Sequence, residues 1–90
     1  MQISSHPTFA FNIDRGGTFT DFYVQDIVDC RIVKETAFKV LSQGQEGEGP
    51  VIGIRRYLTS KGLLKDSQPI PNKFIEHINL GTTIATNALL

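Results

Sequence analysis

The chain has 90 residues, with nine basic and nine acidic side chains and no formal net charge. This length fits one domain with a small core. The even charge balance excludes the polybasic surface of a nucleic-acid or membrane binder, so we expect a small-molecule ligand and neither nucleic acid nor membrane as a partner. The single cysteine, Cys30, excludes an internal disulfide and fits a cytoplasmic protein. We expect no secretory signal in residues 1–8 and no membrane span, because the sequence has no suitable apolar run.

The first half of the chain predicts three antiparallel strands over residues 9–41, after a mobile end at 1–8. Apolar residues alternate with small or polar ones from Phe9 to Ile13, which is the period of a half-buried strand. Gly16-Gly17 tolerates positive φ and so predicts a tight hairpin turn into a second strand, Phe19 to Ile27.

A second turn is expected at residues 28–31. A third strand is expected at 32–41, with one face near solvent, because β-branched and aromatic residues there mix with charges. A polar, glycine-rich loop follows at 42–49, and its sequence favours a flexible connector over a phosphate loop because two glutamates would repel an anion.

A helix is predicted over residues 50–62. Pro50 suits a first helical turn, and Val51, Ile54 and Leu58 recur at helical spacing, so we expect this stripe to pack on the sheet. Gly62 is the expected end of the helix. Arg55 and Arg56 are expected to lie on its solvated face.

Residues 74–90 are expected to form a strand and the start of a helix. The strand, 74–80, runs into Gly81-Thr82-Thr83, and the helix begins near Thr83 without a capping residue at the chain's end, which favours an incomplete domain. The order predicts an α/β fold with a mixed sheet, antiparallel at its start and parallel where the chain crosses back through the helix.

The segment Asp14 to Asp21 joins a carboxylate at a strand end to a glycine turn and two hydroxyl side chains. Without side chains, Gly16 and Gly17 would let backbone N–H groups approach phosphate oxygens closely. Thr18 and Thr20 could add hydroxyl donors to the same anion.

Two charged residues complete this hypothesis. Asp14 would face the phosphates through a hydrated Mg²⁺, because a bare carboxylate would repel them. Arg15 could neutralise phosphate charge. The alternative is a plain hairpin turn, since Asp and Gly-Gly are common turn formers. The residues alone support the phosphate site and the plain turn equally.

Asp-x-Gly-Gly-Thr-x-Thr between two strands resembles the first phosphate motif of the actin, heat-shock chaperone and sugar kinase superfamily. The longer string 11–21 is similar to the N-terminus of 5-oxoprolinases and hydantoinase A proteins. The segment 53–56 is similar to that family's helix, and 80–90 to its second signature. The resemblance covers nearly the whole chain and tips the balance toward a phosphate site. Asp21 stands where sugar kinases often carry a basic residue, which argues against that branch.

The resemblance implies the N-terminal part of a hydantoinase/oxoprolinase in a ribonuclease H-like, actin-like ATPase lobe. Such an enzyme uses ATP and Mg²⁺ to phosphorylate the amide oxygen of a cyclic substrate such as 5-oxo-L-proline, which activates it for hydrolysis to L-glutamate. Partners implied are the remainder of the same polypeptide or a hydantoinase B-like subunit, in an oligomer. The implied catalytic residues are Asp14, which organises the metal, Thr82 and Thr83; the residues implied to hold phosphate are Arg15, Gly16, Gly17, Thr18, Thr20 and Gly81. Asn87 is a weaker candidate.

Other hypotheses stay open on the sequence alone. An N-methylhydantoinase or acetone-carboxylase-type subunit would share these motifs, and the 42–49 loop differs in length from that of oxoprolinases, so the substrate is unsettled. A non-catalytic interaction module that keeps a relic of the ATPase hairpin is a third possibility. His6 and His77 stand too far apart for a zinc site, and Cys30 is expected to be a bystander thiol.

Overall fold

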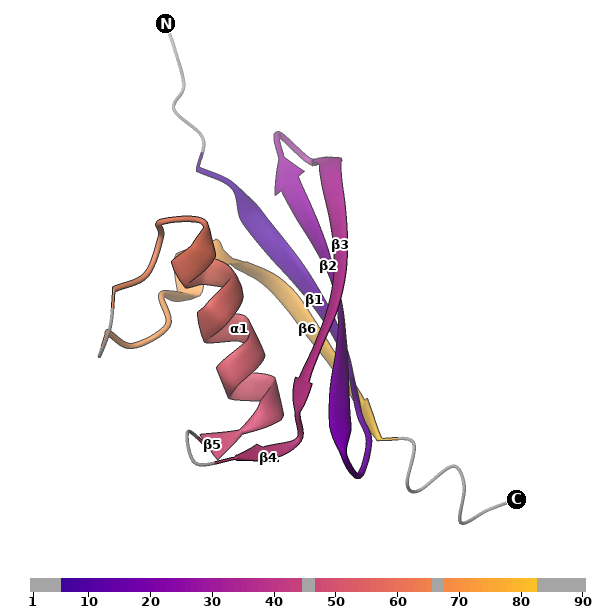
Figure 1. Cartoon of the computed structure of the whole chain (residues 1–90). Coiled ribbons are helices and arrows are strands. Elements are labelled where there is room, and N and C mark those ends of the chain that lie inside the picture. The colour runs from indigo at the N-terminus through magenta and orange to yellow at the C-terminus, as the bar shows by residue number, and fades with distance from the viewer. Residues whose placement is uncertain (1–5, 45–46, 66–67, 83–90) are drawn as a thin grey trace, which may run out of the picture.

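The computed structural model describes residues 6–44, 47–65 and 68–82, and it contains a four-stranded sheet with one helix packed on one of its faces (Figure 1). The main elements are β1 (Thr8–Arg15), β2 (Phe19–Val28), β3 (Arg31–Leu41), α1 (Gly49–Ser60) and β6 (Ile75–Thr82). Two short strands, β4 (Gln43–Gly44) and β5 (Gly47–Glu48), and a 3₁₀ turn, η1 (Asn72–Phe74), lie in the connections.

The sheet has the strand order β3-β2-β1-β6. β1 pairs antiparallel with β2, β2 pairs antiparallel with β3, and β1 pairs in parallel with β6. The predicted α/β class with a mixed sheet is therefore confirmed, including the parallel pairing after the helical crossover. Residues 43–44 and 47–48, which the sequence analysis placed in a loop, form β4 and β5 and pair antiparallel before α1.

The turn between β2 and β3 lies where the sequence predicted it. It consists of Asp29 and Cys30, whose φ angles are 52° and 65°. Positive φ at both residues matches the right-handed twist of the flanking strands, which is why two-residue hairpins adopt it. Neither residue is glycine, so this turn carries some backbone strain.

Helix α1 begins one residue before the predicted 50–62 range and ends at Ser60. Ile54 and Leu58 are buried on the sheet as predicted, but Val51 is 51% exposed, so that part of the predicted stripe is wrong. Gly53 and Tyr57 face the sheet instead. Within the described residues, no helix combines the length and apolar character needed to cross a membrane.

Gly53 determines how closely α1 approaches the sheet. A Cβ built on Gly53 would overlap the ring of Phe22, whose atoms lie where that methyl would stand. The Phe22 ring stacks on Phe38 at 4.7 Å between centroids, and Phe38 stacks on Tyr57 at 5.8 Å. The absence of a side chain at Gly53 thus allows a compact aromatic stack between helix and sheet.

The core lies between α1 and the sheet. β1 contributes the predicted alternating residues, and the remaining buried apolar side chains come from β2, β3, α1 and the crossover. The whole core cluster consists of Phe9, Phe11, Ile13, Phe22, Val24, Val40, Ile54, Tyr57, Leu58, Leu64 and Phe74. Phe74 was expected to open the last strand, but it lies in η1, where it closes the core before β6 begins.

A buried carboxylate ties the end of α1 to the sheet. Asp26 on β2 is 6% exposed; it accepts a hydrogen bond from the Tyr57 hydroxyl at 2.6 Å and pairs with Lys61 Nζ at 2.8 Å. Burial, and secondly the bond to Asp26, raises the pKa of Tyr57. The hydrogen bond to Asp26 raises the pKa of Lys61. Both groups are therefore held in their protonated forms by the fold.

Candidate functional site

The two segments that the sequence analysis singled out meet at one end of the sheet. β1 and β6 are parallel neighbours, so their carboxyl ends lie together, with Asp14 beside Gly81 and Arg15 beside Thr82 (Figure 1). Ligands of open α/β sheets bind outside the carboxyl ends of their strands. We call this region, residues 14–21 together with 81–82, the hairpin end of the sheet. The expected helix and the candidates Thr83 and Asn87 lie outside the described residues.

A shallow pocket of about 490 Å³ opens beside the hairpin end. It is lined by Asn12, Ile13, Asp14, Asp21, Phe22, Tyr23, Asn79, Leu80 and Gly81. Asn79 Nδ2 donates a hydrogen bond to Asn12 Oδ1 at 2.9 Å, which joins β6 to β1 through side chains as well as backbone. Gly16, Gly17 and Thr18 do not line this pocket; they form the turn that follows Asp14.

The predicted hairpin turn at Gly16-Gly17 joins β1 to β2. Gly16 N donates to Phe19 O at 3.0 Å, and three residues connect β1 to β2. Among the described residues, the glycine with positive φ is Gly62, at 77°, so this turn does not use the tolerance of Gly16-Gly17 for positive φ. A three-residue connection reverses the chain here without a left-handed residue.

The glycines at this end leave open space. A Cβ built on Gly17 or on Gly81 would meet no other atom within 4 Å. Glycine weakens a strand interior and often marks a place where a ligand or another backbone comes close. Neither backbone conformation nor packing within the described residues requires a glycine at these two positions.

The two threonines of the motif occupy different environments. Thr18 is exposed at the turn, whereas Thr20 is fully buried on the face that α1 covers. The Thr20 hydroxyl lies 3.0 Å from Ser42 Oγ. A direct contact between the Thr20 hydroxyl and a phosphate does not fit this arrangement, because that hydroxyl is enclosed and already bonded. Thr20 supports the turn from below, and the phosphate role of Thr18 stays a prediction.

Ser42 is a residue that sequence reasoning missed. It is 2% exposed, its Oγ donates to Gly16 O at 2.7 Å, and its N donates to Thr18 O at 2.9 Å. Its carbonyl accepts a hydrogen bond from Gly49 N at 2.9 Å, at the start of α1. Ser42 thus fixes the glycine turn to both β3 and the helix. As one polar residue at the start of a polar segment, it gave no signal of this role.

Charge is unevenly placed around Asp14. Asp14 and Asp21 are exposed cross-strand partners, and like charges directly opposite each other are destabilising. Lys39 Nζ lies 3.8 Å from Asp21 Oδ1 and offsets part of this repulsion. Arg15 Nη1 lies 3.7 Å from Glu48 Oε1, so its guanidinium is drawn toward β5. The expected contact of Arg15 with phosphate stays a prediction.

The described part of the chain contains no cluster of three or more His, Cys, Asp or Glu side chains able to hold a metal ion. A hydrated divalent cation between two neighbouring carboxylates would reduce their repulsion. Magnesium usually keeps several waters and is held by one or two carboxylates together with substrate phosphates. The donor set at Asp14 and Asp21 fits that mode of binding.

Comparison with known proteins shows which family the chain belongs to. Residues 10–90 match the family model described as the hydantoinase/oxoprolinase N-terminal region. The chain is 42% identical over 85 residues to 5-oxoprolinase 1 of Arabidopsis thaliana and 41% identical over 83 residues to 5-oxoprolinase of Dictyostelium discoideum. Each alignment covers 89% of this chain and 6% of the relative, so the chain spans a small part of the length of these proteins. No solved structure matches the chain.

Proposed function

Because the chain belongs to the hydantoinase/oxoprolinase family, we propose that it supplies the phosphate-binding part of an ATP-dependent cyclic-amide hydrolase. The proposed substrate is 5-oxo-L-proline and the proposed product is L-glutamate. The chain covers a small part of such an enzyme, so the remainder of the active site would come from a longer polypeptide or from a hydantoinase B-like subunit.

The observation that carries the proposal is the meeting of Asp14 with Gly81 at the hairpin end of the sheet. The Asp14 carboxylate, the exposed turn and the strand end at Gly81 lie together, although Asp14 and Gly81 are 67 residues apart in the sequence. The open space at Gly17 and Gly81 supports close backbone approach to an anion. A plain hairpin would need neither the open strand end nor a carboxylate that, among the described residues, has no cationic partner.

The chemistry of the reaction explains why such a site is useful. An unstrained lactam is a poor electrophile, and ATP with Mg²⁺ supplies a phosphoryl group that turns the amide oxygen into a leaving group. The protein contributes mainly position and charge stabilisation. On this proposal the backbone N–H groups near Gly17 and the Thr18 hydroxyl hold phosphate oxygens, and Asp14 orients the hydrated metal.

Ser42 and Thr20 have a supporting part in the same proposal. Their hydroxyls bond to each other beneath the turn, and Ser42 holds the Gly16 carbonyl at 2.7 Å. With that carbonyl held from the helix side, the turn is fixed before any ligand arrives. Preorganised donors lower the cost of binding because they need no reordering.

The test is ATP-dependent release of glutamate from 5-oxo-L-proline by the full-length protein that carries this region. We expect Asp14→Asn to abolish most of the turnover, since the neutral amide binds a divalent cation poorly. Asp29→Asn is the matched control: Asp29 is also exposed, it lies in the turn at the other end of β2, and Asn tolerates its φ of 52°.

Three results would count against the proposal. Equal turnover in wild type and Asp14→Asn would remove Asp14 from the metal role. ATP-dependent turnover of a hydantoin or a ketone, with none of 5-oxoproline, would replace the substrate while keeping the site. The absence of any Mg-ATP binding by a correctly folded full-length protein would favour a relic hairpin in a non-catalytic module.

A further inference from the structure

The strand β3 has a free edge. It is the outermost strand in the order β3-β2-β1-β6, and across the described residues no strand pairs with its outer side along its 11 residues. Ile32, Val33 and Leu41 on this strand are 53%, 60% and 55% exposed. A long edge strand with exposed apolar residues is a template for pairing with another extended segment.

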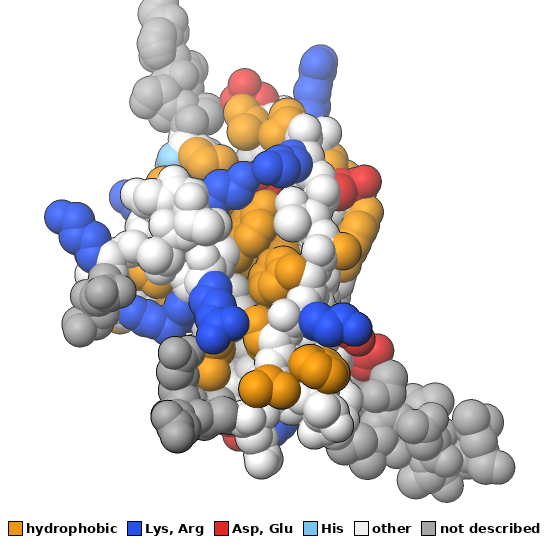
Figure 2. Space-filling view, in the orientation of Figure 1, with side chains coloured by type: hydrophobic (Ala, Val, Ile, Leu, Met, Phe, Trp, Pro, Cys, Tyr) orange, Lys and Arg blue, Asp and Glu red, His pale blue; other side chains and the backbone are white. Residues whose placement is uncertain are grey.

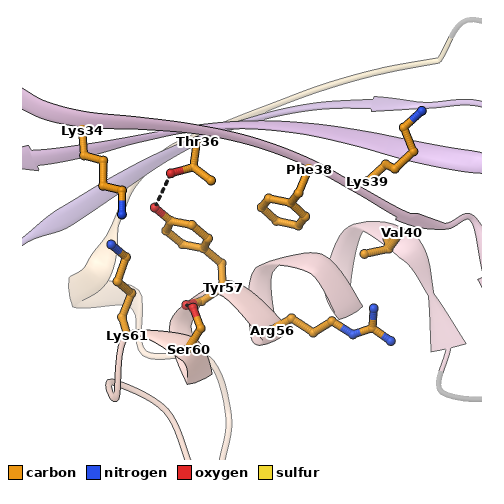
Figure 3. Close-up of a pocket in the computed structure, with 9 residues that line it drawn as sticks. All are labelled: Lys34, Thr36, Phe38, Lys39, Val40, Arg56, Tyr57, Ser60 and Lys61. Carbon is orange, nitrogen blue, oxygen red and sulfur yellow. Dashed lines mark hydrogen bonds between the residues drawn. The ribbon is translucent and has the colours of Figure 1, made fainter.

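A groove of about 430 Å³ runs beside this edge, between β3 and α1. Its floor is formed by the rings of Phe38 and Tyr57, which lie parallel within 2° at 5.8 Å between centroids. The side chains of Lys34 and Lys61 converge beside the Tyr57 hydroxyl, while Arg56 extends along the helix toward the other end of the groove (Figure 3). An apolar floor with basic residues around it is therefore open to solvent next to the free edge.

Positive charge exceeds negative charge at this groove. Among the described residues, the acidic side chain beneath it is Asp26, which is bonded to Tyr57 and to Lys61. Lys34 is the cross-strand partner of Asp26, and its ammonium group lies near that of Lys61 (Figure 3). Figure 2 shows basic side chains around an exposed apolar strip on this face. In a chain without net charge, this concentration gives the groove a preference for an acidic ligand.

We propose that β3 and this groove bind an extended, acidic segment of a second polypeptide by β-strand addition. Main-chain bonds to β3 would supply affinity, and the side chains on one face of the added strand would enter the groove. Because cross-strand neighbours share a face of the sheet, the partner residue across from Lys34 is acidic and the one across from Phe38 is apolar.

A second copy of the same chain does not fit this pattern. The β3 residues on the face toward α1 are Lys34, Thr36, Phe38 and Val40, and none of them is acidic. Edge-to-edge pairing of two copies of β3 with helices on the same face would therefore place no β3 carboxylate in the groove. The charge of the groove selects a different, acidic strand.

The probe is a fluorescein-labelled nine-residue peptide whose alternate residues Leu, Val and Glu lie across from Phe38, Thr36 and Lys34. Binding to the 90-residue chain is followed by fluorescence anisotropy, and a peptide of the same composition with the alternation scrambled is the control. We expect Lys34→Glu to weaken binding about tenfold, because an attraction is replaced by a repulsion. Lys65→Glu makes the same charge change outside the groove and should alter affinity less than about twofold.

Hydrogen exchange separates strand addition from surface adsorption. The bound peptide should slow exchange of alternate backbone amides within residues 31–41, and higher salt should weaken binding. Circular dichroism of both variants is measured to check that they keep the fold. Equal affinity for the scrambled peptide, unchanged exchange in β3 at saturation, or a self-associated chain that protects the same amides without peptide would each overturn the proposal.

Discussion

Replacing Gly53 by alanine should destabilise the protein, although alanine is the better helix former. In an exposed helix interior the change would stabilise by about 1 kcal/mol. At Gly53 the new Cβ would stand no more than 2.5 Å from the three nearest atoms of the Phe22 ring. Carbon atoms pack at about 3.5–4.0 Å, so the ring or the helix must move by about 1 Å or more.

The surroundings leave little room for that movement. Phe22 is 2% exposed and its ring is stacked on Phe38, which in turn is stacked on Tyr57. Overpacking of a core usually costs about 1–3 kcal/mol and sometimes more. After the gain of about 1 kcal/mol in helix propensity, we expect a net loss of about 1–2 kcal/mol. The total stability of a chain of this size is on the order of 5–13 kcal/mol, so the loss is a large part of it.

Urea unfolding followed by far-ultraviolet circular dichroism measures the effect. The midpoint for Gly53→Ala should fall by about 1–2 M. Phe22→Leu in the same chain should recover part of the loss through a favourable coupling in a double-mutant cycle. Thr59→Ala, at an exposed position of α1, should leave the midpoint equal or higher. A Gly53→Ala protein as stable as wild type would show that the helix does not approach Phe22 this closely.

Further predictions concern the turns and the buried carboxylate. Ser42→Ala should cost about 1–3 kcal/mol in urea unfolding, because the Gly16 carbonyl and the buried Thr20 hydroxyl lose their partner; an unchanged midpoint would contradict that role. Cys30→Gly should stabilise by about 0.5–1 kcal/mol, because φ is 65° there; a loss of stability would refute a left-handed turn. The fold raises the pKa of Tyr57 above 10.0 and that of Lys61 above 10.5. The contribution of these two groups to the free energy of unfolding is therefore complete below pH 10 and is lost as pH rises through the raised pKa values. Tyr57→Phe should therefore give a lower melting temperature at neutral pH but a shallower fall above pH 10, and an equally steep fall would contradict the linkage.

Periodicity was enough to predict the sheet. The alternation in β1 and the β-branched residues of β3 led to strands within one or two residues of those observed. The parallel pairing of β1 with β6 followed from the order of elements, because a helix between two strands normally crosses back to the same sheet. These features depend on local patterns that a sequence displays directly.

Side-chain environments were harder to predict because they depend on which neighbour arrives from elsewhere. Val51 has the helical spacing of a core residue, yet the close approach at Gly53 turns it to solvent. Thr20 looks like a ligand contact in its motif, but the strand alternation directs it toward Ser42, 22 residues away. Hydrophobic spacing does not encode such tertiary partners.

The central claim is that the hairpin end of the sheet binds the phosphates of a nucleotide. Calorimetric titration of Mg-ATP into the full-length protein, comparing wild type with Gly17→Ala, tests it most directly. A Cβ at Gly17 meets no atom within 4 Å, so the variant should unfold at the same urea midpoint as wild type. Its affinity for Mg-ATP should fall about tenfold or more, because the new methyl group occupies space that the phosphates need. Equal affinity for Mg-ATP in two equally stable proteins would contradict the claim.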